Sequence, residues 1–351
     1  MREVARGLAA AVAALFAMAG VAAAGLALLG TGGVGLTAAV VASAVGGRVE
    51  VEAMPAGVLP VAVRGELHVI PLGLSLAGAM VLGWLLLRRR DDGLLVRGAA
   101  AAVAFPAALT AIALLAKGKP PLPEGIGGGC VSAGPRLPWS GHLDAGFSVA
   151  VGPAVLGGVV WALVVVGVCW LVARFPFVAK GFRAARWPSA GLVVVCLAAA
   201  WTFGGAPAAG GVLLVLPQLV SGAVLLGLGV PWTVDTTGAL SCVPDIGHFT
   251  PGLWVSGALL LGCGIAVAVR RRPLRRAAAA GAVVGGVSTV MTLLSHVSLD
   301  VAVTAFGFSV PVLDARLTAN PLLALLAGAL AGFAGCLLVD AISVSSRAWK
   351  R

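Results

Sequence analysis

Residues Pro71–Arg90 read PLGLSLAGAMVLGWLLLRRR, an apolar run that ends in three arginines. Residues Leu253–Arg272 repeat this arrangement as LWVSGALLLGCGIAVAVRRR. About 20 apolar residues in a helix match a hydrocarbon layer roughly 30 Å thick, and basic residues gather at the cytoplasmic ends of such helices. The two stretches therefore predict membrane-spanning helices whose arginine ends lie in the cytoplasm.

The composition of the whole chain indicates the same class. Of its 351 residues, 60% are hydrophobic and 11% are charged, whereas soluble domains carry about 25% charged residues. A net charge of +11 would suit a nucleic-acid partner in a soluble protein. Because the basic residues flank apolar runs, membrane orientation explains them better, and we predict no nucleic-acid partner. The apolar segment after Arg6 continues to Gly47, longer than a signal peptide needs, so we expect a retained first span.

The apolar runs predict an all-α fold, a polytopic bundle of transmembrane helices, because backbone groups in lipid must be hydrogen-bonded within the chain. Two stretches, Leu8–Gly47 and Ala190–Val230, are each about 40 residues long and are broken by glycines. If part of each is re-entrant or broken, the chain has up to ten helices. The predicted spans are Leu8–Leu29, Val69–Leu87, Gly98–Ala116, Val149–Ala173, one within Ala190–Val230, Leu253–Val269, Ala277–Ser295 and Pro321–Leu338.

The distribution of basic residues predicts about eight crossings of the cell membrane with both termini in the cytoplasm. With one net crossing for each long stretch, 18 of the 24 basic residues lie inside. Two crossings in each would turn Arg88–Arg90 outward, against the preference of basic residues for the cytoplasmic side. The six basic residues expected outside are Arg48, Arg64, Lys117, Lys119, Arg136 and Arg316.

Three short motifs recur in the same order and predict an internal duplication. They are His-x-x-Pro at 68–71 and 248–251, the arginine triplets at 88–90 and 270–272, and Gly-Phe-Ser-Val at 146–149 and 307–310. We predict half-repeats at residues 1–189 and 190–351, each with four spans. An even number of crossings in each half makes the repeats parallel, related by an axis along the membrane normal. Chance alignment of low-complexity apolar sequence is the alternative.

Several segments resemble the streptophobe family, a set of very hydrophobic, low-complexity membrane proteins of actinomycetes. The resemblance implies the membrane class. That family has no assigned activity, so the resemblance implies no catalytic residue and no cofactor. The segments that carry it are Leu36–Val49 (LTAAVVASAVGGRV), Pro71–Arg88 (PLGLSLAGAMVLGWLLLR), Gly146–Arg174 (GFSVAVGPAVLGG and onward) and Leu216–Trp232 (LPQLVSGAVLLGLGVPW).

Few residues are candidates for a site. Gln218 and Ser221 are the polar groups of the second broken stretch, where they either line a transport path or lie among closely packed small residues.

No ionisable residue falls within the predicted spans, which argues against proton or sodium coupling. The four histidines lie in four separate outer loops, and we predict no metal site and no cofactor. Cys130 and Cys242 lie in outer loops, where an oxidising compartment favours a disulfide between them; the alternative is two free thiols.

These observations favour an integral protein of the cytoplasmic membrane that is not an enzyme and has a structural or partner-binding role in the cell envelope. Its expected partners are the lipid bilayer and either another membrane protein or a second copy of the chain. A permease or channel for a small solute, built from two parallel repeats, is the alternative. An intramembrane or outer-face enzyme is the second alternative.

Overall fold

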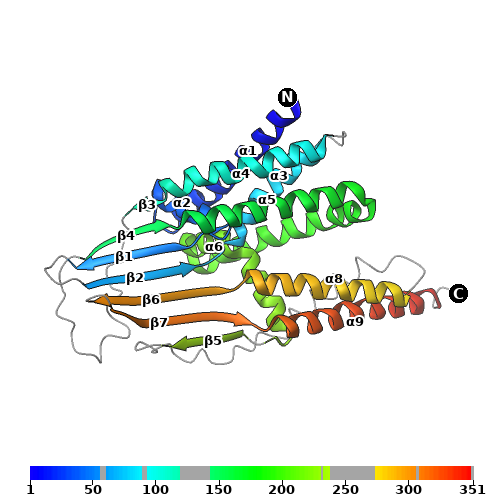
Figure 1. Ribbon diagram of the computed structural model, residues 1–351. Helices are drawn as coiled ribbons and strands as arrows, with labels where there is room; N and C mark the ends of the chain where they lie inside the picture. Colours follow the sequence, from blue (N-terminus) through cyan, green and yellow to red (C-terminus); the bar gives the residue numbers. More distant parts are fainter. Residues whose placement is uncertain are drawn as a thin grey trace. The chain divides into compact units, whose positions relative to one another are not determined.

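The computed structural model describes residues 1–55, 61–88, 93–118, 143–230, 232–237, 273–305 and 308–348. Most of them are helical (Figure 1). They belong to two compact units. The first is formed chiefly by Met1–Leu216 and Ser298–Ala315, and the second by Pro217–Asp235, 273–297 and 316–348. The predicted repeats, 1–189 and 190–351, stay a prediction.

The helices of the first unit pack through small side chains. Gly78 faces Met18, and a Cβ added there would lie 2.7 Å from the Met18 sulfur. Phe105 and Leu109 are fully buried, and the Phe105 ring stacks on Trp161 with centroids 4.5 Å apart. Close approach of helix backbones is how helices associate where lipid surrounds them. These helices are α1 (Arg2–Leu28), α2 (Val34–Ser43), α3 (Leu72–Leu87), α4 (Leu94–Leu115), α5 (Val151–Arg174) and the first part of α6 (Pro176–Gly227).

The described residues include four helices that are long and apolar enough to cross a membrane: α1, α4, α5 and the Ala190–Gly227 part of α6. They confirm the predicted class of helical membrane protein. Helices α3, α8 (Pro273–Leu294) and α9 (Pro321–Ala348) contain shorter apolar stretches. The predicted span Leu253–Val269 lies outside the described residues, so the count of eight crossings is not established by the structure.

Both of the long apolar stretches are broken, as their glycines predict. The first divides into α1 and α2, and α2 has only 10 residues. At 1.5 Å per residue α2 is about 15 Å long, half the thickness of the hydrocarbon layer. The second stretch bends at Gly205, where φ is 70° and ψ is −166°. Only glycine adopts such a conformation readily, because it has no Cβ.

The all-α prediction was wrong for the segments between the helices, which form a seven-stranded sheet (Figure 1). Its order is β3-β4-β1-β2-β6-β7-β5, and β1 pairs antiparallel with both β2 and β4. Strand β2 also pairs antiparallel with β6, far away in the sequence. The strands are β1 (Val49–Pro55), β2 (Val61–His68), β3 (Lys117–Gly118), β4 (Leu143–Val149), β5 (Trp232–Thr237), β6 (Val297–Ala305) and β7 (Phe308–Ala319).

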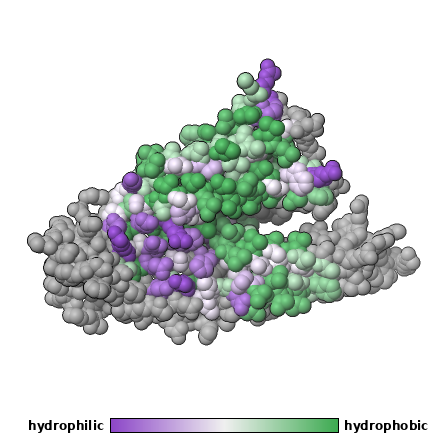
Figure 2. All heavy atoms as spheres, in the orientation of Figure 1, coloured by the Kyte–Doolittle hydropathy of each residue, from purple (hydrophilic) through white to green (hydrophobic). Residues whose placement is uncertain are grey.

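Alternation of apolar and polar residues explains these strands. In Val49–Glu52, which reads VEVE, successive side chains point to opposite faces of the sheet. The apolar face of β1 and β4 carries Val49, Val51, Phe147 and Val149, which pack with small residues of α2, α4 and α5. The other face is hydrophilic, and Figure 2 shows hydrophilic residues gathered over the sheet and hydrophobic ones over the helices.

The register of β2 and β6 predicts a specific cross-link. Glu66 lies opposite Asp300, and opposite residues of antiparallel strands have Cα atoms about 4.5–5.5 Å apart, within the range of a disulfide. In a variant whose native cysteines are replaced by serine, Glu66→Cys with Asp300→Cys should form a disulfide on mild oxidation, detected by mass spectrometry. Glu66→Cys with Val301→Cys is the control, because residue 301 points to the other face. Cross-linking of the control alone would contradict the register.

Candidate functional site

The hydrophilic face of the sheet is the first candidate site. Glu50 lies opposite Ser148 on β4 and Glu66 on β2, and Glu66 lies opposite Asp300 on β6. Lys117 of β3 lies opposite Ser148. One row of side chains therefore crosses five strands and brings together residues from four distant parts of the sequence. We call the polar face the surface formed by Glu50, Glu52, Arg64, Glu66, His68, Ser148, Ser298 and Asp300.

The charges of the polar face add little to stability. Arg64 Nε lies 2.9 Å from Glu52 Oε1, and Arg48 Nη1 lies 4.0 Å from Glu66 Oε2. All four side chains are about half exposed, and exposed ion pairs contribute about 0–1 kcal/mol. Glu50 opposite Glu66 places like charges on adjacent strands, which is unfavourable. Folding alone therefore does not explain this arrangement of charges.

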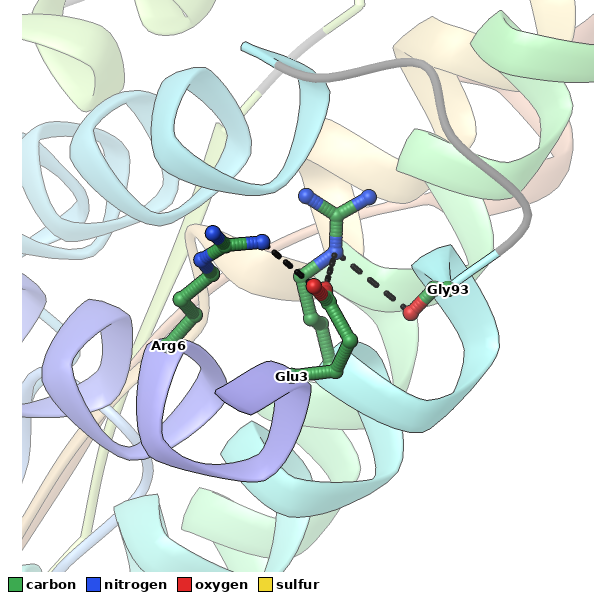
Figure 3. A network of polar contacts seen from close by, with 4 residues as sticks. Glu3, Arg6 and Gly93 are labelled. Carbon is green, nitrogen blue, oxygen red and sulfur yellow. Dashed lines mark hydrogen bonds and ion pairs between the residues drawn. The ribbon is translucent and has the colours of Figure 1, made fainter. Parts of the chain in front are cut away.

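A buried ion pair at the opposite end of the first unit is the second candidate (Figure 3). The Arg97 side chain is only 3% exposed, and its Nε lies 3.1 Å from Glu3 Oε2. The same nitrogen donates a hydrogen bond to the Gly93 carbonyl at 3.4 Å. Glu3 also pairs with Arg6 one turn further along α1. The pair thus joins the first turn of α1 to the first turn of α4.

Sequence analysis missed this pair. It placed Arg97 in a cytoplasmic loop because the predicted span began at Gly98, whereas α4 begins at Leu94. The positive end of a helix dipole lies at its N-terminus, so Glu3 is favourable on α1 and Arg97 is unfavourable on α4. The Glu3 carboxylate offsets that cost. A Cβ at Gly93 would lie 3.1 Å from Glu3 Oε2, so a larger residue would crowd the carboxylate. This close fit indicates a structural tie between α1 and α4.

The predicted polar residues Gln218 and Ser221 lie on the second part of α6, in the second unit. Ser221 Oγ is 3.3 Å from Ser295 Oγ, just after α8, and donates to the Gln218 carbonyl at 3.0 Å. Gln218 is half-buried. Four buried hydroxyl groups lie on this part of α6 and along α8 and its C-terminal end, and we call them the hydroxyl seam: Ser221, Ser288, Thr292 and Ser295.

Helix α8 packs closely on α9 beside the hydroxyl seam. A Cβ at Gly285 would lie 2.7 Å from the Leu325 carbonyl oxygen, and a Cβ at Gly328 would lie 2.7 Å from Ser288 Oγ. Thr292 donates its hydroxyl hydrogen back to the Ser288 carbonyl at 2.8 Å. Hydroxyl groups of helices in lipid commonly bond to the preceding turn in this way. The seam therefore combines internal hydrogen bonds with tight glycine contacts.

The other residues considered in the sequence divide into two groups. Cys130 and Cys242 lie outside the described residues, so their disulfide stays a prediction. His142 and His248 also lie outside them. Asp300 and Asp314 lie on β6 and β7 rather than in a membrane-spanning helix. Within the part of the chain that the structure describes, no three His, Cys, Asp or Glu side chains gather as ligands of a metal ion would.

No protein family, curated protein or solved structure matches this chain. The resemblance to the streptophobe family therefore stays a prediction from the sequence.

The ion pair predicts unequal effects of two substitutions on stability. Glu3→Gln leaves the buried Arg97 guanidinium without a carboxylate. We expect a loss of about 2 kcal/mol, below the 3–5 kcal/mol of a fully buried pair because Glu3 is itself 35% exposed. Arg6→Gln, which removes the exposed partner, should cost less than about 1 kcal/mol. Unfolding in detergent measures both. Equal losses would show that the buried pair does not join α1 to α4.

Proposed function

We propose that the chain is an integral protein of the cytoplasmic membrane that crosses it eight times, with both termini inside and the sheet outside. The pairing of distant strands supports this topology. Strands β1 and β2 precede α3, β4 follows α4, and β6 follows α8. Because these strands pair with one another, their segments must leave the membrane on one side. These strand-containing segments carry the six basic residues that are expected outside and most of the acidic residues.

The proposed role is structural or partner-binding, without catalysis. The observation that carries it is the polar face, a charged, exposed surface built on a sheet that packs on the helices through its apolar side. Exposed charges that contribute little to folding are available for contact with another molecule. The proposed partners are the lipid bilayer and either another membrane protein or a second copy of the chain.

A permease is the second candidate, and the hydroxyl seam favours it. Buried hydroxyl groups on membrane helices can line a path for a polar solute, and Ser221, on the second part of the broken helix α6, lies beside Ser295. The same groups also serve as packing contacts. Accessibility of the seam to water distinguishes the two roles, because a packed interface excludes solvent and a transport path admits it.

The proposed orientation predicts which reagents reach the sheet. A membrane-impermeant maleimide applied to intact cells should modify Glu50→Cys, because the polar face is exposed and outside. Arg88→Cys at the end of α3 should react only after the membrane is permeabilised. Each variant carries its cysteine in a background without native ones, and mass spectrometry measures the modification. The reverse pattern would place the sheet in the cytoplasm and overturn the topology.

The structural role predicts that the hydroxyl seam is closed to water. Ser221→Cys and Ser295→Cys should resist a small water-soluble thiol reagent in membranes, because both side chains are buried. Ser148→Cys on the polar face is the reactive control, and Ala10→Cys in the core of the first unit is the protected one. Reaction of Ser221→Cys at a rate close to that of Ser148→Cys would favour the permease instead.

A further inference from the structure

Two neighbouring helices of the first unit end in the same motif, a tryptophan followed four residues later by an arginine. Trp84 and Arg88 end α3, and Trp170 and Arg174 end α5. Residues four apart lie on one face of a helix. In α3 the two side chains stack, with Arg88 Cζ 5.1 Å from the centroid of the Trp84 ring. A guanidinium over an indole face is a favourable cation–π contact.

The two motifs lie at the same depth. Helices α3 and α5 both run away from the sheet, since they follow β2 and β4, whose C-terminal ends flank Val49 through Leu67 and Val149. Gly83 of α3 faces Cys169 of α5, where an added Cβ would lie 3.5 Å from the Cys169 sulfur. The two tryptophans each follow this contact by one residue. The arginines follow it by five residues in both helices.

The motifs face outward on opposite flanks of the α3–α5 pair. One residue beyond the contact, each helix has turned by about 100° in the same sense. For parallel helices that face each other, this turn carries the two tryptophans to opposite sides. Both rings are open to the surroundings, Trp84 being 61% and Trp170 43% exposed. Arg88 and Arg174 are also exposed.

We propose that each of these Trp-x-x-x-Arg motifs binds the phosphate group of an anionic phospholipid, in the leaflet on the side away from the sheet. The proposal rests on the membrane insertion of these helices. Exposed tryptophans at the end of apolar helices lie at the depth of the lipid headgroups. A guanidinium matches the geometry of a phosphate and forms two parallel hydrogen bonds with it.

The charge of the lipid follows from the charge of the motif. Each motif presents one positive charge, and none of the four acidic residues of the polar face lies at this end of α3 or α5. Among the described residues of the first unit, the acidic residue at this end is Glu3, which pairs with Arg6 and Arg97. A phosphatidylcholine headgroup carries its own cation, which competes with arginine for the phosphate, whereas phosphatidylglycerol carries none. Attraction of about 1 kcal/mol for each arginine corresponds to a roughly fivefold preference for the anionic lipid at each motif.

Spin-labelled lipids test the proposal with the full-length protein. The protein is reconstituted in phosphatidylcholine vesicles that contain a trace of spin-labelled phosphatidylglycerol or spin-labelled phosphatidylcholine. The fraction of label immobilised at the protein surface gives the selectivity. We expect wild type to prefer phosphatidylglycerol, and Arg88→Gln with Arg174→Gln to lose most of that preference. Trp84→Leu should weaken it by removing the stacking partner. Arg48→Gln with Lys117→Gln, which removes two exposed positive charges at the sheet that are not part of the polar face, is the matched control and should keep it.

Three results would overturn the proposal. They are equal immobilisation of the two lipids by wild type, full selectivity in the double arginine variant, and loss of selectivity on adding inorganic phosphate, which would indicate a site for the free ion. Resistance of the variants to extraction by alkaline carbonate confirms that they are inserted. Reversed orientation of the protein would exchange the leaflets and leave the selectivity unchanged, so this test is independent of the proposed topology.

Discussion

Pairing between strands that lie far apart in the sequence constrains the path of the chain through the membrane. Strand β2 leads into α3, and the chain returns through α4 to reach β3 and β4. Because β1 pairs with both β2 and β4, α3 must begin, and α4 must end, at the same surface. A single additional crossing in this region would place β4 on the far side and break the sheet. In the proposed topology, pairing of β2 and β4 with β1 therefore requires an even number of crossings between them.

Small residues allow the helices between the strands to pack closely enough for the strands to pair. Without a hydrophobic driving force between helices in lipid, association depends on close packing, and glycine and alanine allow it. A Cβ at Gly158 would lie 2.7 Å from a Leu109 methyl group, and one at Gly98 would lie 2.6 Å from a Val166 methyl group. These contacts, with the stacking of Phe105 on Trp161 between them, hold α4 against α5. The packing of α4 on α5 therefore fixes the positions of β3, which follows α4, and of β4, which precedes α5.

The sequence predicts the helices better than it predicts what joins them. The span predicted at Val149–Ala173 agrees closely with α5 at Val151–Arg174, because length and hydropathy are local properties. The alternation in Val49–Glu52 is also local and could have indicated a strand. The register could not be predicted, since Glu66 meets Asp300 only after the helices between β2 and β6 have folded. The Glu3–Arg97 pair was missed for the same reason, because it depends on the packing of α1 against α4.

Acidic and basic residues concentrate at opposite ends of the first unit. Glu50, Glu66 and Asp300 lie on the sheet, and Arg88 and Arg174 lie at the far ends of α3 and α5. The inside-negative membrane potential favours both locations when the sheet faces outward. Arg97 also lies at that far end, but its side chain is buried and is paired with a carboxylate. Arg88 and Arg174 are exposed, so polar groups of the surroundings can stabilise their charge. Arg97 is shielded from the surroundings, and the carboxylate of Glu3 at the start of α1 stabilises its charge instead.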